Sequence, residues 1–87
     1  MSKNTVTQEQ IKDILDKSKI VFNKVGNKTS FGVCELPNGF ILCESSSCVD
    51  PANFDHEIGK EIIMKRFEDK LWELEGYVLQ SKVSGLI

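Results

Sequence analysis

Apolar residues recur at helical spacing near both ends of the chain and form short β-type runs between them. Thr7-Gln8-Glu9-Gln10 has the form of a capping box, in which the first and fourth side chains bind backbone N–H groups at a helix start. Ile11, Ile14 and Leu15 follow at positions i, i+3 and i+4, with charged residues between them. This pattern predicts a short amphipathic helix over residues 7–19.

Between residues 20 and 47, β-branched and aromatic residues occur in short runs separated by turn residues, which predicts a three-stranded antiparallel meander. Pro37 cannot donate the closing hydrogen bond of a two-residue hairpin. It suits the first central position of a type I turn, with Gly39 left-handed in a three-residue loop. The predicted strands are residues 20–25, 28–36 and 40–45, with turns at Gly26-Asn27 and Pro37-Asn38-Gly39.

This loop fixes the register of the second hairpin. It places Leu36 opposite Phe40 and Cys34 opposite Leu42. Because side chains alternate across a strand, both faces of the sheet are then apolar, and both need a cover. One face carries Leu36, Cys34, Phe40 and Leu42, and the other carries Phe31, Val33, Ile41 and Cys43.

A long helix is predicted from Asn53 or Asp55 to about Gln80, because residues 50–55 supply capping side chains and the following apolar residues have helical spacing. One apolar stripe of this helix is about 100° wide, the width expected of a face that packs on a core. It consists of Ile63, Met64, Phe67, Leu71, Leu74 and Val78.

The opposite side of this helix is also apolar. Helices with two apolar sides usually have two partners, so the sequence predicts a homo-oligomer. Gly59 and Gly76 each cost about 1 kcal/mol relative to alanine inside a helix, which indicates a close backbone approach at both positions. The second side begins at Phe54, and the predicted oligomer interface is Ile58, Ile62, Trp72, Gly76 and Leu79.

Together these elements predict a single α+β domain over residues 1–87. A chain of this length buries only about 60–65% of its unfolded surface, so it needs further support. Three cysteines remain thiols in a reducing cytosol, which leaves oligomerisation as the expected support. The net charge of −2 argues against a protein that coats nucleic acid. The sequence shows no signal peptide and no membrane span, so we expect a cytoplasmic location without membrane contact.

Metal and catalytic sites have little support in the sequence. Cys34, Cys43, Cys48 and His56 are zinc-ligand types, but they form no C-x2-C pair, and Cys34 and Cys43 fall on opposite sheet faces. Cys48 with His56 has the composition of a nucleophilic pair, yet no orienting group or oxyanion hole accompanies it. The common catalytic and phosphate-binding motifs are absent. We therefore expect a binding protein without enzymatic activity, metal or cofactor.

Four stretches of the chain resemble one protein family, that of small tailed-phage proteins grouped as the phage gene-49/gene-66 products. The resemblance covers about the last two thirds of the chain, and it implies a phage protein acting in the cytoplasm of the infected bacterium. It carries over no catalytic residues. The stretches are Leu36-Pro37-Asn38-Gly39-Phe40, Cys48-Val49-Asp50-Pro51-Ala52-Asn53-Phe54-Asp55, Glu57-Ile58-Gly59 and Leu71-Trp72-Glu73-Leu74-Glu75-Gly76-Tyr77-Val78-Leu79-Gln80.

Two functional hypotheses follow for such a phage accessory protein. The first is an oligomeric anti-defence sponge that sequesters a nucleotide-derived immune signal, with Asn53 and nearby helix-start amides holding a phosphate and Trp72 stacking on a base. Its ligand residues are Asn53, Lys65, Arg66, Trp72 and Tyr77, which can form one pocket only across subunits. The alternative is an inhibitor that binds a host protein through the second apolar side of the long helix. Trp72 is then a packing anchor.

Overall fold

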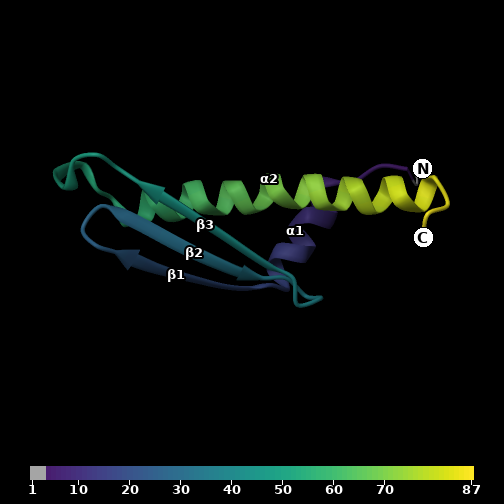
Figure 1. Cartoon of the computed structure of the whole chain (residues 1–87), viewed down its shortest axis with the longest axis horizontal. Coiled ribbons are helices and arrows are strands. Elements are labelled where there is room, and N and C mark those ends of the chain that lie inside the picture. Colours follow the sequence, from purple (N-terminus) through teal and green to yellow (C-terminus); the bar gives the residue numbers. More distant parts are fainter. Residues whose placement is uncertain (1–3) are drawn as a thin grey trace.

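The computed structural model describes residues 4–87 and contains two α-helices and a three-stranded antiparallel sheet (Figure 1). The strand order is β1-β2-β3, so the chain forms a simple meander between its two helices. The predicted α+β order of elements is confirmed. The elements are α1 (Gln8–Asp16), β1 (Lys19–Val25), β2 (Thr29–Glu35), β3 (Ile41–Ser47), the 3-10 helix η1 (Pro51–Asn53) and α2 (His56–Val83).

The second hairpin has the expected geometry, whereas the loop of the first includes Lys28 as well as the predicted Gly26 and Asn27. The predicted register of β2 and β3 is confirmed, because Cys34 pairs with Leu42 and the Leu36 N–H donates to the Phe40 carbonyl at 2.8 Å. Gly39 has φ +91° and its N–H donates to the Leu36 carbonyl, as a type I turn followed by a left-handed glycine requires. The three-residue loop therefore sets which side chains face the helices.

The ends of the helices differ from the predictions in several details, and the first is that α1 ends at Asp16, three residues before the predicted end at residue 19. Thr7 caps α1 by accepting from the Gln10 N–H, but the Gln10 side chain binds Glu75 on α2 instead of closing the capping box. Helix α2 begins at His56, because Asp55 is its N-cap and Asn53 belongs to the separate 3-10 helix. Of the two predicted starts, Asn53 is therefore three residues early and Asp55 is the N-cap itself, and the helix also continues three residues past Gln80 to Val83.

The core lies between α2 and the inner face of the sheet, and α1 closes it from the side. Helix α2 runs across β2 and β3 (Figure 1). The predicted core stripe of α2 is confirmed in its centre, where three residues are fully buried. Met64 and Leu74 are partly buried, and Val78 is exposed. The buried apolar residues are Ile11, Cys34, Leu36, Leu42, Ile63, Phe67 and Leu71.

Two glycines allow α2 to approach β2 closely. A Cβ on Gly59 would stand 2.8 Å from the Ser30 Cβ and still closer to the Ser30 hydroxyl, and a Cβ on Gly32 would stand 2.7 Å from a methyl of Ile63. Four helical residues rise about 6 Å and two strand residues about 6.7 Å, so successive turns of α2 meet alternate residues of β2. The close approach predicted at Gly59 is confirmed. A Cβ on Gly76 would meet nothing within 4 Å, so the close backbone approach predicted at Gly76 does not occur inside a single chain.

Replacing each helical glycine by alanine tests this packing. Gly59→Ala forces the new methyl against Ser30, and we expect a net loss of about 1–2 kcal/mol in the free energy of unfolding despite better helix propensity. Gly76→Ala is the matched control, and it should gain up to about 1 kcal/mol because its methyl enters open space. Urea unfolding followed by circular dichroism measures both values. Equal stabilisation by the two substitutions would contradict the close approach.

The buried thiol of Cys34 should make the stability of the fold depend on pH. Burial raises the pKa of this thiol above its ordinary value of 9.0, and a hydrogen bond with Ser18 opposes the shift only in part. The unfolded chain therefore releases this proton first, so the stabilisation is complete below pH 9 and is lost as the pH rises above it. Cys34→Ala should flatten the fall in unfolding free energy between pH 8 and pH 10.5, measured under reducing conditions. Cys43→Ala, at an exposed thiol, should leave that fall as steep as in the parent chain.

Candidate functional site

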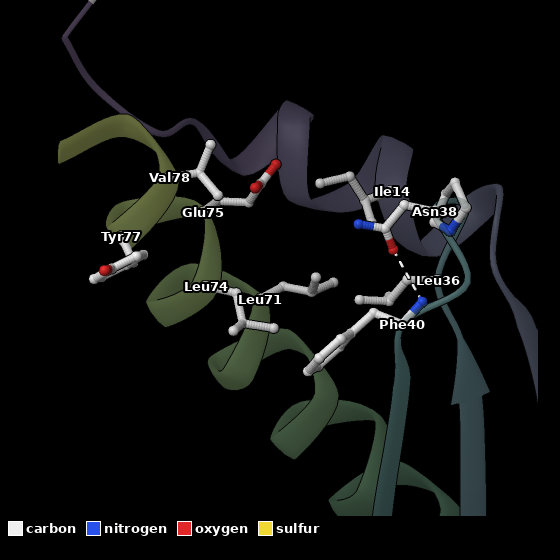
Figure 2. A pocket seen from close by; sticks show the side chains of 10 residues that line it. Ile14, Leu36, Asn38, Phe40, Leu71, Leu74, Glu75, Tyr77 and Val78 are labelled. Atoms are coloured by element: carbon white, nitrogen blue, oxygen red, sulfur yellow. Dashed lines mark hydrogen bonds between the residues drawn. The ribbon is translucent and has the colours of Figure 1, made fainter. Parts of the chain in front are cut away.

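An apolar groove of about 330 Å³ opens beside the C-terminal half of α2 (Figure 2). Three separate parts of the chain form it: α1, the tip of the β2–β3 hairpin, and α2. Figure 2 shows Ile14, Leu36, Phe40 and Leu71 pointing toward its centre. Its lining residues are Ile14, Leu36, Pro37, Asn38, Phe40, Leu71, Leu74, Glu75, Tyr77 and Val78.

The groove exists because α2 is longer than the sheet. A helix of 28 residues is about 42 Å long, whereas a strand of seven residues is about 23 Å long. The C-terminal half of α2 therefore runs past the hairpin tip, where α1 and the N-terminal segment before it lie beside it (Figure 1). Phe40 and Tyr77 remain 52% and 70% exposed at this place. Two aromatic side chains that are this exposed beside an apolar groove make the groove the candidate binding surface.

Two polar contacts hold the walls of the groove. The Asn38 side-chain oxygen accepts from the Phe40 N–H at 3.0 Å, which fixes the hairpin tip. Glu75 on α2 accepts from the Gln10 side-chain amide on α1 at 3.3 Å, which ties the two helices together. Glu75 is the only charged side chain among the lining residues that the structure describes. The groove thus presents a largely uncharged surface with a polar rim.

The start of α2 holds a buried polar pair that the sequence did not reveal. The Ser30 hydroxyl lies 2.7 Å from His56 Nδ1, and Ser30 is fully buried under Gly59. Because Ser30 has no exposed surface, its hydroxyl is closed to a substrate in this structure. Cys48 and His56, which the sequence analysis weighed and disfavoured as a nucleophilic pair, are not bonded to each other, and the Cys48 thiol donates to the Asp50 carbonyl instead. Within residues 4–87, no three His, Cys, Asp or Glu side chains gather as metal ligands would.

The predicted ligand residues lie apart within one chain. Asn53 is at the end of η1, and the Asp55 carboxylate already accepts from the Glu57 and Ile58 N–H groups at the start of α2. The amides expected to hold a phosphate are therefore occupied by an acidic cap. Of the other predicted residues, only Tyr77 lines the apolar groove, and it lies at its outer edge (Figure 2).

The predicted cations are engaged within the chain. Lys65 pairs with Asp69 at 3.3 Å and Glu68 at 3.6 Å, and these carboxylates, Asp69 first, raise the pKa of its ammonium group. Arg66 donates to the Ser45 carbonyl on β3. A phosphate at either residue would compete with these partners. The pairs of Lys65 are exposed and therefore weak, so they reduce but do not abolish its availability.

The second apolar side of α2 is divided between two environments. Ile58 and Ile62 remain exposed and border a small hollow beside Phe54. Trp72, in contrast, is half-buried and packs on the core cluster. Leu79 and Gly76 are half-buried too, and Leu79 borders the N-terminal residues Thr5 and Val6. Of the predicted oligomer interface, only Ile58 and Ile62 are therefore exposed.

Sequence reasoning missed the groove because it assigned Leu74 and Val78 to the core stripe. The available signal was length: a helix of nearly thirty residues cannot be covered by strands of seven. Ser30 was missed because a single serine inside a strand gives no sign of burial. None of the helices within residues 4–87 combines the length and apolar composition that crossing a bilayer requires.

Comparison with known proteins adds one finding. The family described as phage protein (N4 Gp49/phage Sf6 gene 66) matches residues 6–83. The chain belongs to this family. The match extends the resemblance seen in the sequence back to Val6, so it includes α1 and every element that lines the groove. No curated protein and no solved structure matches the chain.

The position of Trp72 yields a prediction. Because the indole packs on the core, Trp72→Ala should lower the free energy of unfolding by about 2 kcal/mol, somewhat less than for a fully buried tryptophan. Tyr77→Ala is the matched control on the same helix, and its ring is largely exposed, so a change within about 0.5 kcal/mol is expected. Chemical denaturation monitored by circular dichroism compares them. If Trp72→Ala were as mild as Tyr77→Ala, Trp72 would be a free surface platform.

Proposed function

We propose that this phage protein is a non-catalytic accessory protein that acts stoichiometrically, by binding a protein of the infected bacterium through the apolar groove. The observation that carries the proposal is the groove itself, with Phe40, Tyr77 and Val78 exposed around it. A concave, mostly apolar surface with a few polar groups at its rim is what the apolar side of a partner helix or loop binds.

The chemistry of the groove supports a protein segment over a nucleotide. A nucleotide carries phosphates, which need cations or free backbone amides. The groove offers a carboxylate at Glu75 and no cation among its lining residues. The partner segment therefore presents apolar side chains to Phe40 and Val78, and an amide or a basic group toward Glu75.

The sponge hypothesis requires a different arrangement. Its ligand residues lie apart within one chain, so a pocket for a cyclic dinucleotide or an ADP-ribose-type signal would have to assemble between subunits. Lys65 and Arg66 would also have to leave their present partners. We retain it as the competing hypothesis because Ile58 and Ile62 remain exposed on α2. An inhibitor that uses that same side of α2 is a third arrangement, and it predicts a partner contact away from the groove.

Site-specific crosslinking in the bacterial host tests the proposal. A photoreactive phenylalanine analogue at Tyr77 should capture one discrete partner, and Phe40→Glu in the same chain should reduce capture at least tenfold by placing a charge in the groove. Val49→Glu is the matched control, because Val49 is 92% exposed in a loop outside the groove. Capture that survives Phe40→Glu, or that occurs only from Ile62, would place the partner elsewhere.

A thermal-shift assay separates the two hypotheses. The purified chain should show no rise in melting temperature with cyclic dinucleotides or ADP-ribose-type compounds if it binds a protein. A rise of several degrees with one of them, and recovery of that compound unaltered after denaturation, would support the sponge and contradict our proposal. Recovery of an altered compound would show enzymatic turnover, which we do not expect.

A further inference from the structure

The outer face of the sheet carries a continuous apolar surface that no other part of residues 4–87 covers. Both helices lie on the inner side (Figure 1). Val21, Val33 and Cys43 stand directly beside one another in the register, so they form one apolar row across all three strands. Phe31 follows on one side of this row and Ile41 on the other. We call these five residues the outer patch.

Three of the five residues of the outer patch are exposed, and Phe31 and Val33 are half-buried. Val21 is 57% and Ile41 48% exposed, and Cys43 is also exposed. These side chains are mostly β-branched or aromatic, the types that pack well across a pleated surface. Patches of this kind on small domains usually contact another protein.

Charge favours a second copy as the partner. Lys19 and Glu35 stand directly opposite each other at one end of the face, so their formal charges cancel. Asn23 and Ser45, which flank Phe31, are uncharged. A partner recognised by charge would find no complementary group here. An identical patch, in contrast, meets no like charge and has the same twist, which aligned packing of two sheets requires.

We infer that the outer patch binds the outer patch of a second copy, with the two sheets packed face to face about a two-fold axis perpendicular to the strands. This axis places the row of Val21, Val33 and Cys43 on the same row of the partner, about 10 Å away. It also places the end with Lys19 and Glu35 over the partner's opposite end, so identical charges do not face each other. This surface is distinct from both the groove and α2.

The size of the face sets the strength of this dimer. Three strands of seven residues have a flat footprint of about 23 Å by 14 Å. This is well below the roughly 800 Å² per partner of a standard interface, even after allowing for the relief of the side chains. The dimer therefore belongs to the small and transient class of interfaces, and it dissociates in the micromolar range.

Sedimentation velocity of the full chain from 5 to 500 µM tests the inference. We expect a shift from the 9.8 kDa monomer toward a dimer, and Val33→Glu should raise the dissociation constant at least tenfold. Val49→Glu, which adds the same charge outside the sheet, should leave association unchanged. Circular dichroism checks that each variant is folded. If Val33→Glu unfolds, Val21→Lys takes its place, because Val21 is already exposed. A chain that stays monomeric at 500 µM, or a dimer that persists in both outer-patch variants, overturns the inference.

Cys43 is a natural reporter of the same contact. Its alkylation should be at least fivefold slower at 500 µM than at 5 µM chain, under excess reagent, because dimerisation covers it. Cys48, which lies outside the strands, serves as the internal reference. A rate at Cys43 that does not depend on concentration contradicts the inference. Phe40→Glu should leave sedimentation and Cys43 alkylation unchanged. The outer-patch variants should likewise leave crosslinking from Tyr77 unchanged. The two sets of variants therefore test the dimer and the proposed function independently.

Discussion

The whole arrangement depends on how closely α2 approaches β2 at Gly59 and Ser30. Because Gly59 has no side chain and no room for one beside Ser30, the two backbones come together there, and Ile63 then packs against Gly32. Four helical residues rise almost as far as two strand residues, so the contact of Gly59 with Ser30 is followed by that of Ile63 with Gly32. The bond between Ser30 and His56 satisfies the one hydroxyl trapped by this contact. The fold is therefore fixed at the start of α2, while its far end is left free to form a groove.

Most of the fold was predictable because local rules and burial agree. The turn at Pro37-Asn38-Gly39 determined the register of the hairpin, and the register in turn determined that Cys34 is buried and Cys43 exposed. The core stripe of α2 followed from its helical spacing. The start of α2 was left open between Asn53 and Asp55 because residues 50–55 contain several capping side chains, and only the three-dimensional structure shows that Asp50 caps η1 while Asp55 caps α2.

The candidate site was much less predictable, because it depends on which parts of the helices and the sheet are covered by other elements of the fold. Periodicity showed that α2 has two apolar sides, but it did not show that Trp72, on the second side, packs on the core cluster. Periodicity also assigned Val78 to the core, although the sheet ends before this part of α2. Single residues such as Lys65 and Arg66 looked available because their partners, Asp69 and the Ser45 carbonyl, become apparent only when the helix and the strand edge are placed.

The contact between Arg66 and Ser45 has a consequence for how copies of this chain can assemble. Even-numbered residues of β3 bond to β2, as the Cys48 N–H bond to the Lys28 carbonyl shows, so the Ser45 carbonyl points to the free edge of the sheet. The guanidinium of Arg66 already donates a hydrogen bond to that carbonyl. A strand from another molecule would have to displace it before pairing with β3. Head-to-tail addition of strands, the route to an open filament, is therefore opposed at one edge, and this favours closed assemblies.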